Sequence, residues 1–237
     1  MNKPENCVII GGGQSIQEGV SLGLKDFLKD KFVLACNYAF LHFPHTALVF
    51  TDRDFYAPHP ELVSAGWNPD ISPQLRLEPL ILCGWKNDGL TPQNVFPNTK
   101  LLKRSDRFWG SEGHIKGFYK GTDNGLVGFI ALSIACDLLK EDGNIFLLGF
   151  DWTISNKTTH YYKDVRHHGV GVTKYYQNNS PERLFKPFEA SKCKIYNVNM
   201  TSNIPNFEKI TYQQFFTQHP FASSHQESCR RYISENL

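Results

Sequence analysis

The stretch that decides the fold is Cys7-Val8-Ile9-Ile10-Gly11-Gly12-Gly13-Gln14-Ser15. Four apolar residues predict a buried parallel strand, and the glycines allow the chain to turn sharply and to approach a ligand closely. We therefore expect a phosphate-facing turn, with Ser15 or Ser21 capping the helix that follows. The residues of this turn, which would bind the nucleotide, are Gly11, Gly12, Gly13, Gln14 and Ser15. The turn matches neither G-x-G-x-x-G nor G-x-x-x-x-G-K-[ST], so a plain strand-to-helix connection is the alternative.

The composition is that of an ordinary globular chain. Its 237 residues are 41% hydrophobic, which suffices for one large core, and we expect a single domain over 1–237. The net charge of +2 carries no signature of non-specific nucleic-acid binding. Six scattered cysteines without a C-x-x-C pair indicate buried thiols, a reducing compartment and no structural zinc. No stretch is apolar over the length of a bilayer, so we expect a cytoplasmic protein without a transmembrane segment.

Short apolar runs followed by polar residues recur along the chain and predict the sheet. They predict strands at residues 7–10, 32–36, 47–50, 79–83, 145–149 and 194–198. A nearly all-apolar helix is expected at 126–135, between two of these strands, which indicates a parallel crossover. The fold prediction is an α/β, Rossmann-like domain with a mainly parallel sheet and helices on both faces. Two lid-like insertions are expected, at about 84–121 and 153–180.

Polar residues follow several of these strands, at the edge where open parallel sheets bind ligands. Asn37 follows the second strand, Asp52 and Asp54 follow the third, and Asp151 follows the strand at 145–149. Two carboxylates one residue apart, Asp52 and Asp54, suit Mg²⁺ or Mn²⁺ bridging the phosphates of a nucleotide. The alternatives are a solvated turn for this pair, a loop-stabilising turn residue for Asn37 and a loop cap for Asp151.

Three histidines in the second insertion are candidates for a general base. Imidazole titrates near neutral pH and can take a proton from an acceptor hydroxyl, which is why His160, His167 and His168 stand out. Their spacing is not that of a zinc site. An exposed loop histidine is the alternative for each.

The order of these motifs resembles that of the bacterial lipooligosaccharide-type sialyltransferases, and of the related 6-hydroxymethylpterin diphosphokinase-like superfamily. The resemblance is carried by Ile9-Ile10-Gly11-Gly12-Gly13-Gln14-Ser15, Cys36-Asn37, Asp123-Asn124-Gly125, Leu147-Leu148-Gly149-Phe150-Asp151, the histidine-bearing loop and Lys194-Ile195-Tyr196-Asn197. It implies a Rossmann-like nucleotide-dependent transferase in which the glycine turn and Asn37 hold the nucleotide. It also implies that the late-loop base falls nearest His168 or His167, and that four residues contact the phosphate or the donor: Thr122, Asp123, Asn124 and Gly125.

The sequence departs from the sialyltransferase pattern at two places. Asp52 stands where these enzymes carry Asn and work without metal, and Thr51-Asp52-Arg53-Asp54 is closer to the acidic motif of the diphosphokinase branch. Gln14 stands where proline is usual, whereas Ser15 is kept.

Glycosyl transfer from a nucleotide sugar, as co-substrate, to a hydroxyl acceptor is the function that these patterns predict. An ATP-dependent diphosphokinase and a non-catalytic nucleotide-binding module are the alternatives. The acceptor is left open among a glycan, a small molecule and a modified nucleic acid, because acceptor specificity resides in irregular loops. The oligomeric state is left open as well, a homo-oligomer included.

Overall fold

The computed structural model describes residues 4–50, 80–83, 99–101, 127–139, 141–153, 161, 180–218, 229–231 and 233. Within these residues, no helix is long and apolar enough to cross a membrane.

An eight-stranded sheet forms the centre of the described structure, and all its strand pairs are parallel. The strands are β1 (Asn6–Ile10), β2 (Val33–Cys36), β3 (Ala47–Phe50), β4 (Leu80–Cys83), β5 (Thr99–Leu101), β6 (Asn144–Leu148), β7 (Lys194–Asn197) and β8 (Glu208–Lys209). Their order is β5-β4-β3-β2-β1-β6-β7-β8. The prediction of an α/β fold with a mainly parallel sheet is confirmed, and the six predicted strands are present.

Two strands were not predicted. β5 lies inside the segment 84–121 that we expected to be an irregular insertion, so that prediction is wrong for Thr99–Leu101. β8 contains only Glu208 and Lys209. The rest of 84–121, and most of 153–180, lies outside the described residues.

The sheet has its switch point between β1 and β6. From β1 the chain adds β2 to β5 on one side, and then returns to add β6 to β8 on the other side. β1 and β6 pair along their whole length, from Asn6 opposite Asn144 to Ile10 opposite Leu148. The carboxyl ends of both strands therefore lie side by side, which is where open parallel sheets bind ligands.

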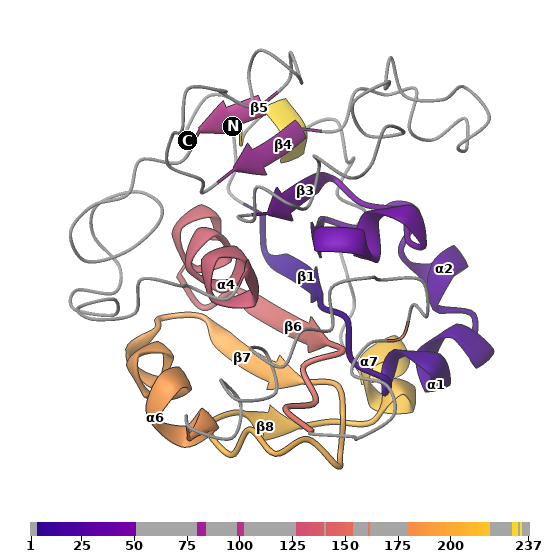
Figure 1. The fold of residues 1–237 in the computed structure, drawn as a ribbon, viewed down its shortest axis with the longest axis vertical. Coiled ribbons are helices and arrows are strands. Elements are labelled where there is room, and N and C mark those ends of the chain that lie inside the picture. The colour runs from indigo at the N-terminus through magenta and orange to yellow at the C-terminus, as the bar shows by residue number, and fades with distance from the viewer. Residues whose placement is uncertain are drawn as a thin grey trace, which may run out of the picture.

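Helices cover both faces of the sheet (Figure 1). They are α1 (Ile16–Ser21), α2 (Leu24–Phe27), the 3₁₀ helix η1 (Asn37–Leu41), α4 (Val127–Leu138), α6 (Pro181–Phe185), the 3₁₀ helix η5 (Lys186–Ala190) and α7 (Tyr212–Gln218). Alternate residues of β1 face opposite layers, as the period of a strand requires. Cys7 and Ile9 belong to the core with α4, α6 and η5, whereas Val8 and Ile10 belong to the core with α1, α2 and α7.

The first helical segment is broken in two, although its apolar pattern suggested one helix. Gly23 separates α1 from α2 and has a φ of +90°, a left-handed conformation that favours glycine. Gly19 is needed for a different reason, because a Cβ atom there would lie 2.3 Å from Cε1 of Tyr212. The close packing of α7 on α1 thus depends on a missing side chain.

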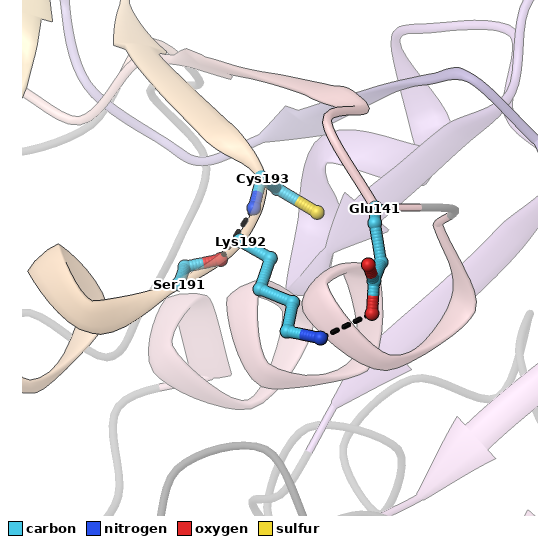
Figure 2. A network of polar contacts seen from close by, with 4 residues as sticks. All are labelled: Glu141, Ser191, Lys192 and Cys193. Carbon is cyan, nitrogen blue, oxygen red and sulfur yellow. Dashed lines mark hydrogen bonds and ion pairs between the residues drawn. The ribbon is translucent and has the colours of Figure 1, made fainter.

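Polar contacts fasten the connection before β7 to the turn before β6, at the amino-terminal edge of the sheet (Figure 2). The Lys192 ammonium pairs with Glu141, and the Cys193 amide donates to the Ser191 hydroxyl at 3.1 Å. The Lys194 amide also donates to the Gly143 carbonyl at 2.9 Å. Both charged side chains are exposed, so their ion pair adds little stability.

A buried histidine and a buried arginine join the C-terminal segment to the start of β3. The Arg230 guanidinium donates to the carbonyl oxygens of Thr46 (3.2 Å) and His45 (3.3 Å). His45 is 5% exposed, and its Nδ1 lies 3.0 Å from the Phe43 carbonyl oxygen. Burial, with a smaller contribution from the charge of Arg230, lowers the pKa of His45 to about 4. His45 is therefore neutral at pH 7.

Acid should destabilise the fold through His45. In the unfolded chain His45 takes up a proton near pH 6.5, whereas in the folded protein it does so near pH 4. The contribution of neutral His45 to the free energy of unfolding is therefore fully present above pH 6.5. It decreases as the pH falls, by about 3 kcal/mol at pH 4. Urea unfolding at pH 7, 5.5 and 4.5 should show a shallower pH dependence for His45→Asn than for the wild type. Equal slopes would contradict this assignment.

Candidate functional site

The glycine turn after β1 is bound to the end of β6. The Gly11 amide donates to the Leu148 carbonyl at 2.8 Å, and the Gly13 amide donates to the Gly149 carbonyl at 2.9 Å. A Cβ at Gly11 would lie 2.9 Å from the Gly149 oxygen, and one at Gly13 would lie 2.5 Å from the carboxyl carbon of Asp151. Gly11 and Gly13 therefore allow two segments of the protein to approach each other, rather than only a ligand.

Asp151 is the residue that joins the strand ends. Its Oδ2 accepts a hydrogen bond from the Ser15 amide at 2.9 Å, and its Oδ1 accepts one from the Asn199 side chain, also at 2.9 Å. The Ser15 hydroxyl donates to Oδ1 as well. The side chain is only 8% exposed. One carboxylate thus connects the turn after β1, the end of β6 and the loop after β7.

The prediction that Ser15 or Ser21 caps the first helix holds only for the position of Ser15. Ser15 is the N-cap residue of α1, but its hydroxyl donates to Asp151 and makes no capping hydrogen bond. Ser21 ends α1 and donates to the Glu18 carbonyl at 2.7 Å. The helix is short, and the amide of Ser15 is already occupied by a carboxylate. The structure gives no support to a phosphate bound at this helix terminus.

Gly12 is bonded differently from its two neighbours, because its carbonyl contacts the residue Tyr161 and not the end of β6. Its carbonyl oxygen accepts a hydrogen bond from the Tyr161 amide at 2.5 Å. Its own amide makes no hydrogen bond to any described residue. A main-chain N–H of this kind can donate to an oxygen of a ligand.

Asn37 also has an unused polar atom. It begins η1 directly after β2, and its Oδ1 is buried without a hydrogen-bond partner among the described residues. Its φ of +48° lies in the left-handed region. A buried acceptor without a partner costs about 1–3 kcal/mol, which a ligand donor can relieve. The alternative that Asn37 stabilises its own loop has no hydrogen bond to support it.

Left-handed residues gather at this carboxyl edge. Gly149 (φ +71°) and Trp152 (φ +49°) follow β6, and Asn37 follows β2. Strained backbone of this kind clusters at functional sites. Two left-handed residues lie elsewhere: Asp142 (φ +66°) in the turn before β6 at the opposite edge, and Gly23 between α1 and α2.

A second polar network holds the loop after β7, and the sequence analysis missed it. Asn197 at the end of β7 donates to the Phe150 carbonyl (3.0 Å) and to the Ser202 hydroxyl (2.9 Å). The Ser202 hydroxyl donates to the Phe150 carbonyl at 2.7 Å. The signal was available, because Asn197 and Asn199 follow the rule of polar residues at strand ends that identified Asn37.

An aromatic cluster lies beside Gly12, and it too was missed. The Tyr161 ring meets the His42 ring edge-on at 5.7 Å and the Phe43 ring at 5.9 Å, measured between centroids. The Lys25 ammonium lies 5.9 Å from the Phe43 centroid. His42 and Phe43 thus adjoin Tyr161, the residue that is hydrogen-bonded to the glycine turn, and Lys25 lies next to Phe43.

The structure brings part of the predicted site together. Seven residues lie at the carboxyl edge near the switch point: Gly11, Gly12, Gly13, Gln14, Ser15, Asn37 and Asp151. Nine lie outside the described residues: Asp52, Asp54, Thr122, Asp123, Asn124, Gly125, His160, His167 and His168. The described part of the chain contains no group of three or more His, Cys, Asp or Glu side chains that suits a metal ion.

The cysteines whose side chains the structure describes are not suited to act as nucleophiles at this site. All five are buried free thiols in the core that contains α4. Cys36, next to Asn37, is the nearest in sequence to the site, and burial raises its pKa to about 12. A thiol of this kind stays protonated at neutral pH and is a poor nucleophile.

Comparison of the chain with protein-family models, with curated proteins and with solved structures finds no match. A fold of this class hosts many functions, so only the residues of the site can indicate what the protein does.

Gly13→Ala should destabilise the protein by about 1–3 kcal/mol, because its methyl group overlaps the Asp151 carboxylate and the Gly149 carbonyl. Asp151→Ala removes one of these clashes. The double variant should lose less stability than the sum of the single variants by more than about 0.5 kcal/mol in urea unfolding. Strict additivity would contradict the contact between the turn and the carboxylate.

Proposed function

We propose that the protein is a transferase that binds a nucleotide sugar at the carboxyl ends of β1 and β6 and transfers the sugar to a hydroxyl acceptor. The observation that supports this most is the buried Oδ1 of Asn37, which has no hydrogen-bond partner among the described residues and follows β2, the strand next to β1. Ligands of open parallel sheets bind at this place. The motif order along the sequence points to the same class of enzyme.

Three described residues would have different roles in binding the nucleotide. Asn37 Oδ1 would accept a hydrogen bond from a base amino group or a ribose hydroxyl, and the Gly12 amide would donate to a phosphate oxygen. Asp151 would act as a positioning residue, because its carboxylate oxygens already accept three hydrogen bonds from the protein. It would hold Gly12 at a fixed distance from the end of β6.

The reaction needs one base and one leaving group. The acceptor hydroxyl gives its proton to the base while its oxygen bonds to the anomeric carbon. The bond from that carbon to the phosphate oxygen breaks, and the nucleotide leaves with the electron pair. We expect the base to be one of three histidines, His160, His167 or His168. A metal ion, if the reaction uses one, would be bound by Asp52 and Asp54.

A diphosphokinase is the second candidate, favoured by the acidic pair Asp52 and Asp54. The two reactions differ in what is transferred and in the need for a divalent cation. Incubation with a panel of nucleotide sugars and with ATP, each with Mg²⁺ or with EDTA, should release a nucleotide from a nucleotide sugar. Release of AMP from ATP only with Mg²⁺ would select the diphosphokinase. Tight binding without turnover would select a non-catalytic module.

Asn37→Gly should separate binding from stability. Glycine accepts the left-handed conformation and removes the unpartnered oxygen, so the free energy of unfolding should stay within about 1 kcal/mol of wild type or rise. Nucleotide affinity should fall about tenfold or more in isothermal titration.

Asp142→Gly is the matched control, since it relaxes a left-handed residue at the opposite edge of the sheet. It should leave nucleotide affinity unchanged. A loss of stability in Asn37→Gly without a loss of affinity would refute a ligand role for Asn37.

A further inference from the structure

A nucleotide phosphate near the glycine turn meets an acidic environment. Asp151 contributes a buried carboxylate, and Glu18 lies in the first turn of α1. Both charges act on Tyr212, whose pKa is raised first by burial and then by Asp151 and Glu18. A bound phosphate therefore needs positive charge from another direction.

Lys25 is placed to supply that charge. Lys29 and Lys31, which follow α2, pair with Asp26 at 2.6 Å and with Asp30 at 2.8 Å. Lys25, inside α2, makes no ion pair with any described residue, and its ammonium lies over the Phe43 ring. Its side chain therefore extends toward the aromatic cluster instead of toward a neighbouring carboxylate.

His42 belongs to the same aromatic cluster. Its half-buried ring contacts Tyr161, and the Tyr161 amide is bonded to Gly12. An imidazole N–H donates a hydrogen bond to an anion, and a protonated imidazole adds a positive charge. Continuous contacts thus connect Gly12 through Tyr161 to His42, and through Phe43 to Lys25.

We propose that Lys25 and His42 form the phosphate-binding side of the glycine turn. This assignment rests on the proposed nucleotide-dependent function and deepens it. The two side chains compensate the charges of Asp151 and Glu18 when the phosphate binds. During transfer they stabilise the negative charge that grows on the leaving phosphate oxygen.

The test compares ligands that differ only in phosphate. Isothermal titration in EDTA uses CMP, UMP, AMP and GMP, their four nucleosides, and inorganic pyrophosphate. Lys25→Gln and His42→Gln should each weaken the binding of the preferred nucleotide about tenfold and change nucleoside binding less than twofold. Lys29→Gln, a lysine of the same region that already has a carboxylate partner, should have no effect. His42→Lys keeps a cation and should restore most of the affinity lost in His42→Gln.

The outcomes separate this inference from the proposed function. Equal losses for nucleotide and nucleoside, or no loss at all, would overturn the phosphate role of Lys25 and His42 while nucleotide binding by the wild type stands. Absence of nucleotide binding by the wild type would overturn the proposed function. Pyrophosphate binding then decides. An affinity for pyrophosphate at least about tenfold lower in the Lys25→Gln/His42→Gln double variant than in the wild type supports an anion site. An unchanged affinity, or no pyrophosphate binding by the wild type, overturns it.

Discussion

The carboxylate of Asp151 is the interaction on which the carboxyl edge of the sheet depends. It accepts hydrogen bonds from the amide and hydroxyl of Ser15 and from the side chain of Asn199. These residues belong to segments far apart in the chain, and the carboxylate brings them to the switch point between β1 and β6. Hydrogen bonds to a charged acceptor are stronger than neutral ones, and a buried charge that loses its donors is expensive. The missing Cβ atoms of Gly11 and Gly13 are required by the same contact, because they let the turn approach Gly149 and Asp151.

The same carboxylate changes what kind of ligand the turn can hold. In phosphate-binding turns the amides at the start of a helix face the anion. Here the Ser15 amide faces Asp151, and Glu18 follows within the first turn of α1. The energy that stabilises the junction therefore opposes a phosphate at that point. The proposed nucleotide donor would therefore place its phosphate on the Gly12 side, where His42 contacts Tyr161 and Lys25 lies over Phe43.

The sequence predicted the central sheet well because its strands are buried on both faces and read as continuous apolar runs. β5 and β8 were not predicted because they are short, and β8 consists of two charged residues, Glu208 and Lys209. The hydrogen bond of Ser15 to Asp151 was not predicted for another reason. A serine before a helix predicts a local cap, whereas its actual partner is 136 residues away, and no local pattern encodes such a partner. His42 was missed because the search for a base followed the histidine-rich later loop, and only the contact with Tyr161 places His42 beside the turn.

Asp151 and Asn37 show two opposite uses of a polar side chain at one sheet edge. All donors that Asp151 needs come from the protein, so its contribution is to stability and to the position of the turn. Asn37 keeps its Oδ1 buried without a partner in the described part of the chain and its backbone in a left-handed conformation, and both features cost stability. A residue that costs stability is explained when a bound ligand supplies the missing donor. The unsatisfied oxygen of Asn37 therefore says more about binding than the satisfied carboxylate of Asp151, even though the carboxylate holds the site together.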